Sequence, residues 1–261
     1  VRAKVNQNIN LDDYKNVWVI AEQWQGVIAP VTIELIGEGR KLANVLGKEL
    51  MVVVAGYDMD AEVEKLLHYG VDKVYYLKHE LLQAFSTDGY VKSYADLIHD
   101  KKPEIVLVGA SSLGRDIGPR LAARIGTGLT ADCTKLEIDE EDHKLLMTRP
   151  AFGGNMMATI VCPKNRPQMS TVRPGVMEKA AYSEEKHGEI EVITPALEAA
   201  DIRTTLEEIV SDAQKKVNLV DAKIVVSGGR GLKTPEGFEM VQELADLIGG
   251  VVGSSRACVE A

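Results

Sequence analysis

The stretch Leu50-Met51-Val52-Val53-Val54-Ala55 decides the fold, because it is an unbroken apolar run of strand length. Strands that are apolar on both faces belong to parallel sheets covered by helices on both sides. Similar apolar runs occur at residues 17–21, 74–77 and 105–108. The segments around and between these runs have helical periodicity, at residues 31–47, 61–69, 90–99 and 115–125. This alternation predicts βαβ crossovers, and hence an α/β fold with a Rossmann-like parallel sheet.

The pattern changes after Asp132, where short extended pieces follow one another without helices between them. These pieces cover residues 134–138, 145–149, 156–162 and 168–172, and turn-like sequences separate them. We expect four antiparallel strands that extend the parallel sheet. The acidic cluster at residues 137–142 is interpreted as a solvated turn rather than a docking surface.

A second boundary is expected near residue 200. We predict a first domain over residues 1–200, a linker and helix over 201–220, and a second α/β domain over 221–261. Thr204-Thr205-Leu206-Glu207 has the spacing of a capping box and opens an apolar helical stripe that reaches Val217. In the second domain a strand over 222–227 is followed by a helix with Thr234 as N-cap and Pro235 as first residue, and then by a strand at 251–253. A single βαβ unit is too small for its own core, so we expect this domain to continue elsewhere or to pack on another surface.

Composition excludes several classes of protein. The 261 residues carry a formal net charge of −9 without a basic cluster, which argues against nucleic-acid binding. No apolar run is long enough to span a membrane, and the sequence contains neither a P-loop nor an HExxH motif. The three cysteines form no CxxC pair and the N-terminus has no hydrophobic signal core, so we expect a cytoplasmic protein.

Two polar turns follow consecutive predicted strands of the second domain. Gly228-Gly229-Arg230-Gly231 follows the first strand, and Ser254-Ser255-Arg256 follows the second. Taken singly, each has a structural interpretation, as a tight turn with a solvated arginine or as an N-capping serine. The carboxyl ends of parallel strands meet at one edge of the sheet, where ligands bind in open α/β folds. Together the two turns therefore predict a site for a phosphate-bearing ligand.

The turn at residues 111–116 lies in the corresponding position of the first domain. Asp116 would repel a phosphate there, so we interpret this segment as a structural turn. No pair of acid–base residues is evident anywhere in the chain, which leaves an enzymatic role open.

Several longer motifs of this sequence resemble the alpha subunit of electron transfer flavoproteins. The strand and helix at residues 17–47 share the resemblance, and so do six motifs in the family's order: GASSLGRDIGPRLA at 109–122, GLTADC at 128–133, RPAFGGN at 149–155, MSTVRPG at 169–175, SGGRGL at 227–232 and GSSRA at 253–257. The resemblance extends over essentially the whole chain.

The resemblance implies an electron carrier that forms a heterodimer with a beta subunit. It implies that the first domain packs on that subunit and that the second binds FAD, with Arg230, Ser255 and Arg256 in contact with the cofactor and Ser254 beside them. The family's later FAD-binding loops have no counterpart before Ala261. The implied redox partners are an acyl-CoA dehydrogenase or a quinone reductase, and flavin-based electron bifurcation is one form of the activity. The alternative is a nucleotide-binding or interaction module without a redox role.

Overall fold

The computed structural model describes residues 9–151, 156–210, 219 and 222–259. By its internal contacts the chain divides into two compact units, Val1–Leu206 and Glu207–Ala261. Each unit is described separately below.

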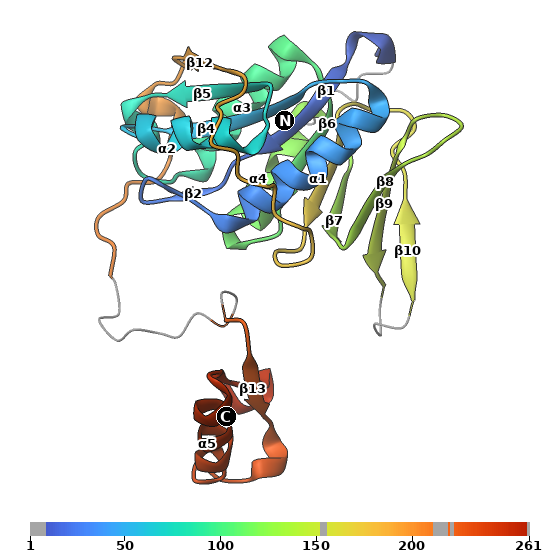
Figure 1. The fold of residues 1–261 in the computed structure, drawn as a ribbon. Helices are drawn as coiled ribbons and strands as arrows, with labels where there is room; N and C mark the ends of the chain where they lie inside the picture. Colours follow the sequence, from blue (N-terminus) through green and yellow to red (C-terminus); the bar gives the residue numbers. More distant parts are fainter. Residues whose placement is uncertain (1–8, 152–155, 211–218, 220–221, 260–261) are drawn as a thin grey trace. The chain divides into compact units, whose positions relative to one another are not determined.

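A seven-stranded parallel sheet forms the centre of the first unit (Figure 1). Its strand order is β12-β5-β4-β1-β6-β11-β7, and every pairing within it is parallel. The strands are β1 (Lys15–Ile20), β4 (Leu50–Gly56), β5 (Lys73–Lys78), β6 (Pro103–Gly109), β7 (Leu129–Cys133), β11 (Gln168–Val172) and β12 (Glu189–Ile193). This confirms the Rossmann-like sheet predicted from the apolar runs.

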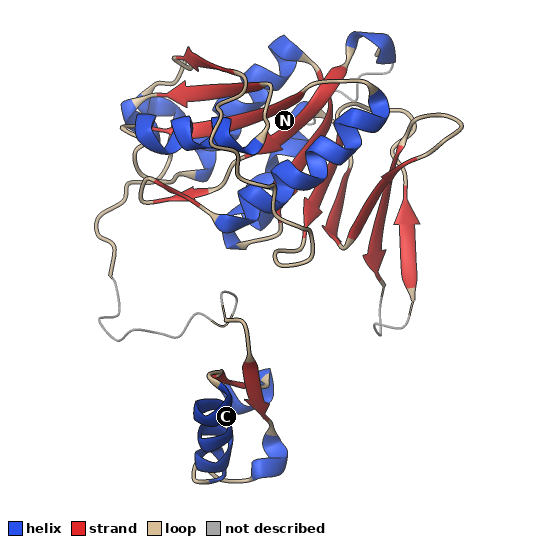
Figure 2. Cartoon of the chain, in the orientation of Figure 1, coloured by secondary structure: helices blue, strands red, loops and turns tan. Residues whose placement is uncertain are grey.

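Helices cover both faces of this sheet (Figure 2). They are α1 (Pro30–Leu46), α2 (Asp60–Lys65), α3 (Thr87–Lys101) and α4 (Ser112–Ile125). Successive side chains of a strand point to opposite faces, so Val17 and Val19 pack in one core with α1 and α2. Trp18 and Ile20 pack in the other core with α3 and α4. Burial on both faces is the reason that the strands are apolar throughout.

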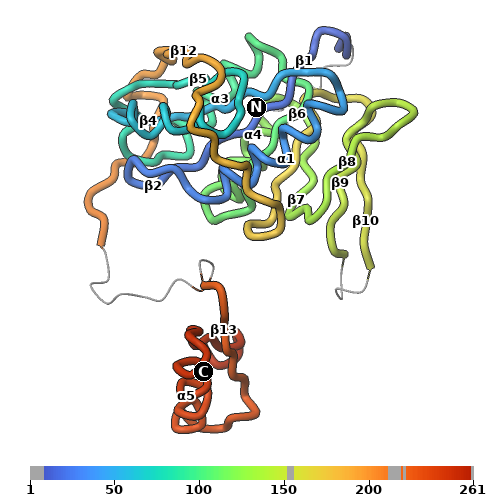
Figure 3. The backbone as a smooth tube through the Cα atoms, in the orientation of Figure 1, coloured from blue at the N-terminus to red at the C-terminus, as the bar shows by residue number. Residues whose placement is uncertain are grey.

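A separate antiparallel sheet follows β7 in the chain (Figure 3). It consists of β8 (Lys135–Ile138), β9 (Leu145–Pro150) and β10 (Met157–Ile160), as predicted for the first three extended pieces. The prediction was wrong for the fourth piece. β11 is a parallel strand inserted between β6 and β7 of the main sheet.

The polar residues of β11 account for this error. All five residues of the strand are buried, although polar residues such as Gln168, Ser170 and Thr171 are typical of a strand with one face in water. Hydrogen bonds make the burial of two of them tolerable. The Gln168 side-chain oxygen accepts from the Leu145 amide at 3.0 Å, and the Thr171 hydroxyl accepts from the Asp132 amide at 2.9 Å.

The helix predicted from Thr204 is absent from residues 204–210, which have no regular secondary structure. The rest of the predicted stripe, to Val217, lies outside the described residues. Leu206, Ile209 and Val210 are 54%, 48% and 82% exposed. Helices of this length owe their stability to the packing of an apolar face. Without such packing, the capping-box spacing and the apolar periodicity are not sufficient to form a helix.

The second unit is a single βαβ arrangement. It contains β13 (Val225–Gly228), the short 3-10 helix η5 (Arg230–Leu232), α5 (Gly237–Ile248), β14 (Val251–Ser254) and α6 (Arg256–Val259). Helix α5 begins later than predicted, because tight turns come first, in which the amides of Gly237, Phe238 and Glu239 each donate to the carbonyl three residues back. Glu236 is therefore the N-cap residue, not Thr234. The buried apolar side chains of this unit, among those described, are Val241 and Ala245.

We predict that Leu35→Ala destabilises the protein by about 2–5 kcal/mol, because Leu35 is completely buried in the core beneath α1. Urea unfolding followed by circular dichroism measures the change in the free energy of unfolding. Val45→Ala on the same helix is the matched control, since Val45 is 65% exposed and its truncation is expected to change stability by less than about 0.5 kcal/mol. Equal effects of the two substitutions would contradict the assignment of this face of α1 to the core.

Candidate functional site

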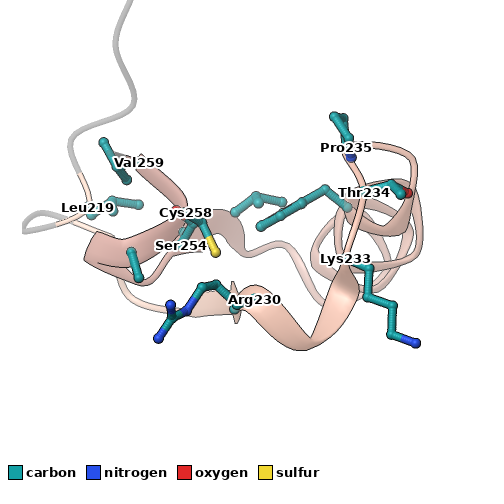
Figure 4. Close-up of a pocket in the computed structure, with 13 residues that line it drawn as sticks. Leu219, Arg230, Lys233, Thr234, Pro235, Ser254, Cys258 and Val259 are labelled. Atoms are coloured by element: carbon teal, nitrogen blue, oxygen red, sulfur yellow. The ribbon is translucent and has the colours of Figure 1, made fainter. Parts of the chain in front are cut away.

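The second unit contains a cavity of about 930 Å³. It lies at the carboxyl ends of β13 and β14, between the turn that follows β13 and the short helix α6 (Figure 4). The residues that line it are Leu219, Gly229, Arg230, Lys233, Thr234, Pro235, Phe238, Val252, Gly253, Ser254, Ala257, Cys258 and Val259. Its volume is within the range of small-molecule and cofactor sites.

The parallel pairing of β13 and β14 brings the two predicted turns together. Gly228 lies opposite Ser254 in the register, and the Ser255 amide donates to the Gly228 carbonyl at 3.0 Å. The two strands therefore end at the same level. This agrees with the expectation that polar residues on consecutive strand ends share one edge of the sheet.

The Gly228-Gly229 pair allows the first turn to fold tightly onto α5. A Cβ atom on Gly228 would lie 2.4 Å from Leu232 Cδ1 and 2.7 Å from the ring of Phe238, so a larger residue would require these side chains to move. After it, the Leu232 amide donates to the Gly229 carbonyl at 2.9 Å and closes the 3-10 turn. This turn places Arg230, at its first position, on the edge of the cavity with an exposed side chain.

The second turn contributes Ser254 to the cavity. Ser255 and Arg256 do not line it, although they adjoin Ser254 in the chain and both are exposed. The Ser255 carbonyl accepts from the Cys258 amide at 2.8 Å, and its hydroxyl lies 3.6 Å from the Cys258 sulfur. Of the four residues predicted for the site, the structure thus places Arg230 and Ser254 on the cavity and the other two at its border.

Several lining residues were missed in the sequence. Lys233 follows the Gly-Gly-Arg-Gly turn by two residues, and this proximity was the available signal for a second cation. Phe238 was assigned only to the apolar face of α5, because helical periodicity does not show which apolar side chains border a cavity. Cys258 lies on the short helix that follows the second turn, and the scattered cysteines along the chain gave no signal for it.

The side chains that line the cavity indicate the chemical class of its ligand. Arg230 and Lys233 supply positive charge, Thr234 and Ser254 supply hydroxyl groups, and none of the described lining residues is a carboxylate. Figure 4 shows Arg230, Ser254 and Cys258 toward one end and Lys233, Thr234 and Pro235 toward the other. The remaining lining, including Phe238, Val252 and Val259, is apolar. Such a site fits an anionic ligand that also carries flat apolar groups.

The corresponding turn of the first unit is structural, as expected. The Ser111 hydroxyl accepts from the Gly114 amide at 3.1 Å and caps α4. Asp116 accepts from the Arg120 side chain at 3.0 Å and from the Thr87 hydroxyl. Within the described residues there is no cluster of potential metal ligands, and no helix is long and apolar enough to cross a membrane.

Comparison with known proteins assigns both units. Residues 17–198 match the electron transfer flavoprotein domain, and residues 218–261 match the electron transfer flavoprotein FAD-binding domain. The chain belongs to the electron transfer flavoprotein alpha-subunit family. It is 50% identical to the electron transfer flavoprotein subunit alpha of Clostridium acetobutylicum, over 97% of this chain and 76% of that protein. This confirms the resemblance drawn from the motifs.

Other members of the family show the same extent of similarity. The electron transfer flavoprotein subunit alpha of Thermoanaerobacterium thermosaccharolyticum is 48% identical, over 96% of this chain and 76% of its own length. The acryloyl-CoA reductase electron transfer subunit beta of Anaerotignum propionicum is 42% identical, over 96% of this chain and 76% of its own length. The similarity thus extends across both units.

FAD is the cofactor of this alpha-subunit chain. Every residue that lines the cavity lies within the segment matched by the FAD-binding domain. The lining also suits the cofactor, since a dinucleotide combines a pyrophosphate, which takes cations and hydroxyls, with two flat ring systems, which take apolar surfaces.

We predict that FAD protects Cys258 from alkylation, because Cys258 lines the cavity and is partly accessible. The flavin-free protein is treated with N-ethylmaleimide, with and without added FAD, and labelled thiols are quantified by mass spectrometry. Cys162, which is also partly accessible but lies in the first unit, is the control and should react at the same rate in both samples. Burial raises the pKa of the Cys133 thiol to about 12, so it should stay unlabelled in the folded protein. Labelling of Cys258 that is unaffected by FAD would argue against this cavity as the cofactor site.

Proposed function

We propose that this chain holds FAD between its two cationic turns and, with a beta subunit, passes electrons to a partner oxidoreductase. The observation that carries the proposal is the cavity of the FAD-binding domain, where Arg230 and Lys233 stand among hydroxyl and apolar side chains without a carboxylate among the described lining residues. Bound FAD supplies the redox chemistry, so the chain needs no nucleophile or general base of its own.

We assign a role to each predicted site residue from its position relative to the cavity. Arg230 and Ser254 line the cavity, and they would hold the pyrophosphate through charge-assisted and neutral hydrogen bonds. Ser255 precedes the short helix at the border of the cavity, and Arg256 is the first residue of that helix. From there the Arg256 guanidinium would act on the flavin, since a nearby positive charge favours the addition of an electron.

The physiological partners are proposed from chemistry and from family names. The Anaerotignum propionicum relative is an electron-transfer subunit of an acryloyl-CoA reductase. This name supports an acyl-CoA dehydrogenase type of partner, and a quinone reductase is the other candidate acceptor. A beta subunit is expected to pack on the first unit, where Met156, Met157 and Ile160, at and within the edge strand β10, expose 66%, 54% and 40% of their surfaces.

Flavin-based bifurcation belongs to this proposal as its most specific form. In such a complex NADH reduces a second flavin, held mainly by the beta subunit, and its two electrons go to different acceptors. We further propose a cytoplasmic location, where the three free cysteines would remain reduced. A nucleotide-binding module without a redox role is disfavoured by the match of residues 218–261 to an FAD-binding domain.

We predict that Arg256→Ala lowers the flavin reduction potential by tens of millivolts, the effect of losing about 1 kcal/mol of charge attraction. Spectroscopic redox titration of the FAD-loaded heterodimer measures the potential. Arg256→Lys should recover only part of the shift, because an ammonium keeps the charge and loses the planar fork. Arg230→Ala is expected to weaken FAD binding about tenfold or more, as the loss of one charge-assisted hydrogen bond predicts. Potentials that are unchanged in Arg256→Ala would remove Arg256 from the flavin site.

The function as a whole is tested by co-purification with the candidate beta subunit, followed by measurement of flavin per heterodimer. A yellow heterodimer that reduces an acyl-CoA dehydrogenase partner is the expected result, since both the FAD-binding domain and the family point to electron transfer. Two flavins per heterodimer would support bifurcation, and one would support a simple electron shuttle. A colourless protein that fails to bind added FAD would contradict the proposal.

A further inference from the structure

Glu22 occupies the position where doubly wound sheets bind their ligands. It follows β1 at the carboxyl end of that strand, and β1 lies between β4 and β6, where the strand order reverses (Figure 1). In open α/β sheets the crevice beyond the carboxyl ends at this reversal is the usual ligand site. The Glu22 residue is nevertheless only 4% exposed, so the crevice is filled by the chain itself.

The backbone of Glu22 is fastened to the first turn of α1. Its amide donates to the Thr32 hydroxyl at 3.0 Å, and its carbonyl accepts from the Ala29 amide at 2.9 Å. Thr32 is fully buried. Both backbone groups of Glu22 are thus bonded, which fixes the backbone of this residue beside the positive end of α1.

The side chain of Glu22 is directed at the first turn of a second helix, α4. Oε2 accepts a hydrogen bond from the hydroxyl of Ser111, which is the N-cap of α4. Oε1 is buried against the backbone of Gly109 and makes no hydrogen bond of ordinary geometry. Burial raises the pKa of this carboxyl, and its contacts with Ser111 and the backbone of Gly109 lower the pKa by less. The group is thus an acceptor at the end of a helix with one oxygen unsatisfied.

Glycines bring the backbone of α4 close to this carboxyl. A Cβ atom on Gly109 would lie 2.2 Å from Glu22 Oε1, and one on Gly114 would lie 2.8 Å from the same oxygen and 1.9 Å from the Gly109 carbonyl. One turn further, a Cβ on Gly118 would press on the Thr171 side chain at 3.1 Å. Glycines of dinucleotide-binding turns have these two tasks, to admit the backbone to a phosphate and to pack the helix on its strand.

We propose that the Glu22 carboxyl group is a built-in substitute for a ligand phosphate, and that the first unit is a nucleotide-type fold closed at its own anion site. The site it closes is formed by the first turns of α1 and α4 and by the Ser111 hydroxyl, and it would accept a phosphate-sized oxyanion if the side chain were removed. A purely structural glutamate at this position would be expected to have both buried oxygens bonded. This inference goes beyond the electron-transfer function and does not depend on it.

Ions from the solvent could reach this site once the carboxyl group is removed. Ser111 is half-buried and Ser112, the first residue of α4, is exposed, so the helix end opens toward the surface. Deleting the carboxyl leaves a polar space lined by a hydroxyl and a helix end, of roughly the size of a small tetrahedral oxyanion. Water fills such a polar space readily, and phosphate would displace it.

The test is titration of inorganic phosphate into Glu22→Ala, in the full chain with its FAD bound and in phosphate-free buffer, by isothermal calorimetry. We expect Glu22→Ala to bind phosphate at least about tenfold more tightly than the wild type. Glu34→Ala is the matched control, because Glu34 of α1 is also buried, at 7% exposure. Its carboxyl group accepts a hydrogen bond from the Gly175 amide and takes no part in the proposed site. This control and the wild type also report any binding of phosphate at the FAD site.

A second substitution locates the bound ion. Adding Ser111→Ala to Glu22→Ala should weaken phosphate binding again, because the hydroxyl that bonds Glu22 would then be missing. Equal phosphate affinity of folded Glu22→Ala and the wild type would overturn the proposal. Binding of phosphate by the wild type that Ser111→Ala abolishes would also overturn it, since the site would then be open.

Glu22→Gln keeps the proposal testable if Glu22→Ala does not fold. The amide has the same shape and fills the crevice, so no phosphate binding is expected.

The pH dependence of stability gives a second readout. The pKa of Glu22 is raised in the folded state, so the unfolded chain loses its proton first, and wild-type stability falls as pH rises above the ordinary value of 4.5. Glu22→Gln should therefore gain stability relative to the wild type between about pH 4.5 and 7. Tyr94 of α3, a titratable group that interacts with Glu22, stays neutral there because burial raises its pKa well above the usual value. A stability difference that is independent of pH would show that the Glu22 carboxyl is not buried in the crevice, and would overturn the proposal.

Discussion

The burial of both faces of a parallel sheet is the constraint on which the rest of this structure depends. Each crossover must return the chain over one face, so every strand in such a sheet ends at the same edge and every helix begins there. The helices of the first unit follow this rule, with α1 and α2 packed in one core and α3 and α4 in the other. As a result, turns that are far apart in the chain meet at one edge, and positive helix ends converge on it.

The two units use this edge in opposite ways. In the second unit the strand ends of β13 and β14 border an open cavity with cationic and hydroxyl groups, which suits an anionic cofactor. In the first unit the corresponding space holds a buried carboxyl group, Glu22, bonded to the cap of α4. A carboxylate at such an edge repels a phosphate, whereas a guanidinium attracts one. The two units therefore differ in the groups at their strand ends, although both have parallel strands that end at one edge.

The second unit also differs in how much apolar surface it buries. Its described core is limited to Val241 and Ala245, while Met240, Leu244 and Leu247 on α5 are 65%, 49% and 84% exposed. A βαβ arrangement of this size buries too little surface for independent stability.

The sequence by itself determined the parallel sheet, most helices and the family, because apolar runs and periodic stripes report burial directly. It also indicated Arg230 and Ser254, since turns after consecutive strands of a parallel sheet share an edge. Only the tertiary structure decided the place of β11, where Gln168 and Thr171 are buried through hydrogen bonds with distant segments. It alone showed that residues 204–210 form no helix, because helix formation there depends on packing that the local pattern does not reveal. The role of Glu22 was equally hidden, for a glutamate after a strand looks the same in sequence whether it faces water or the end of a helix 89 residues away.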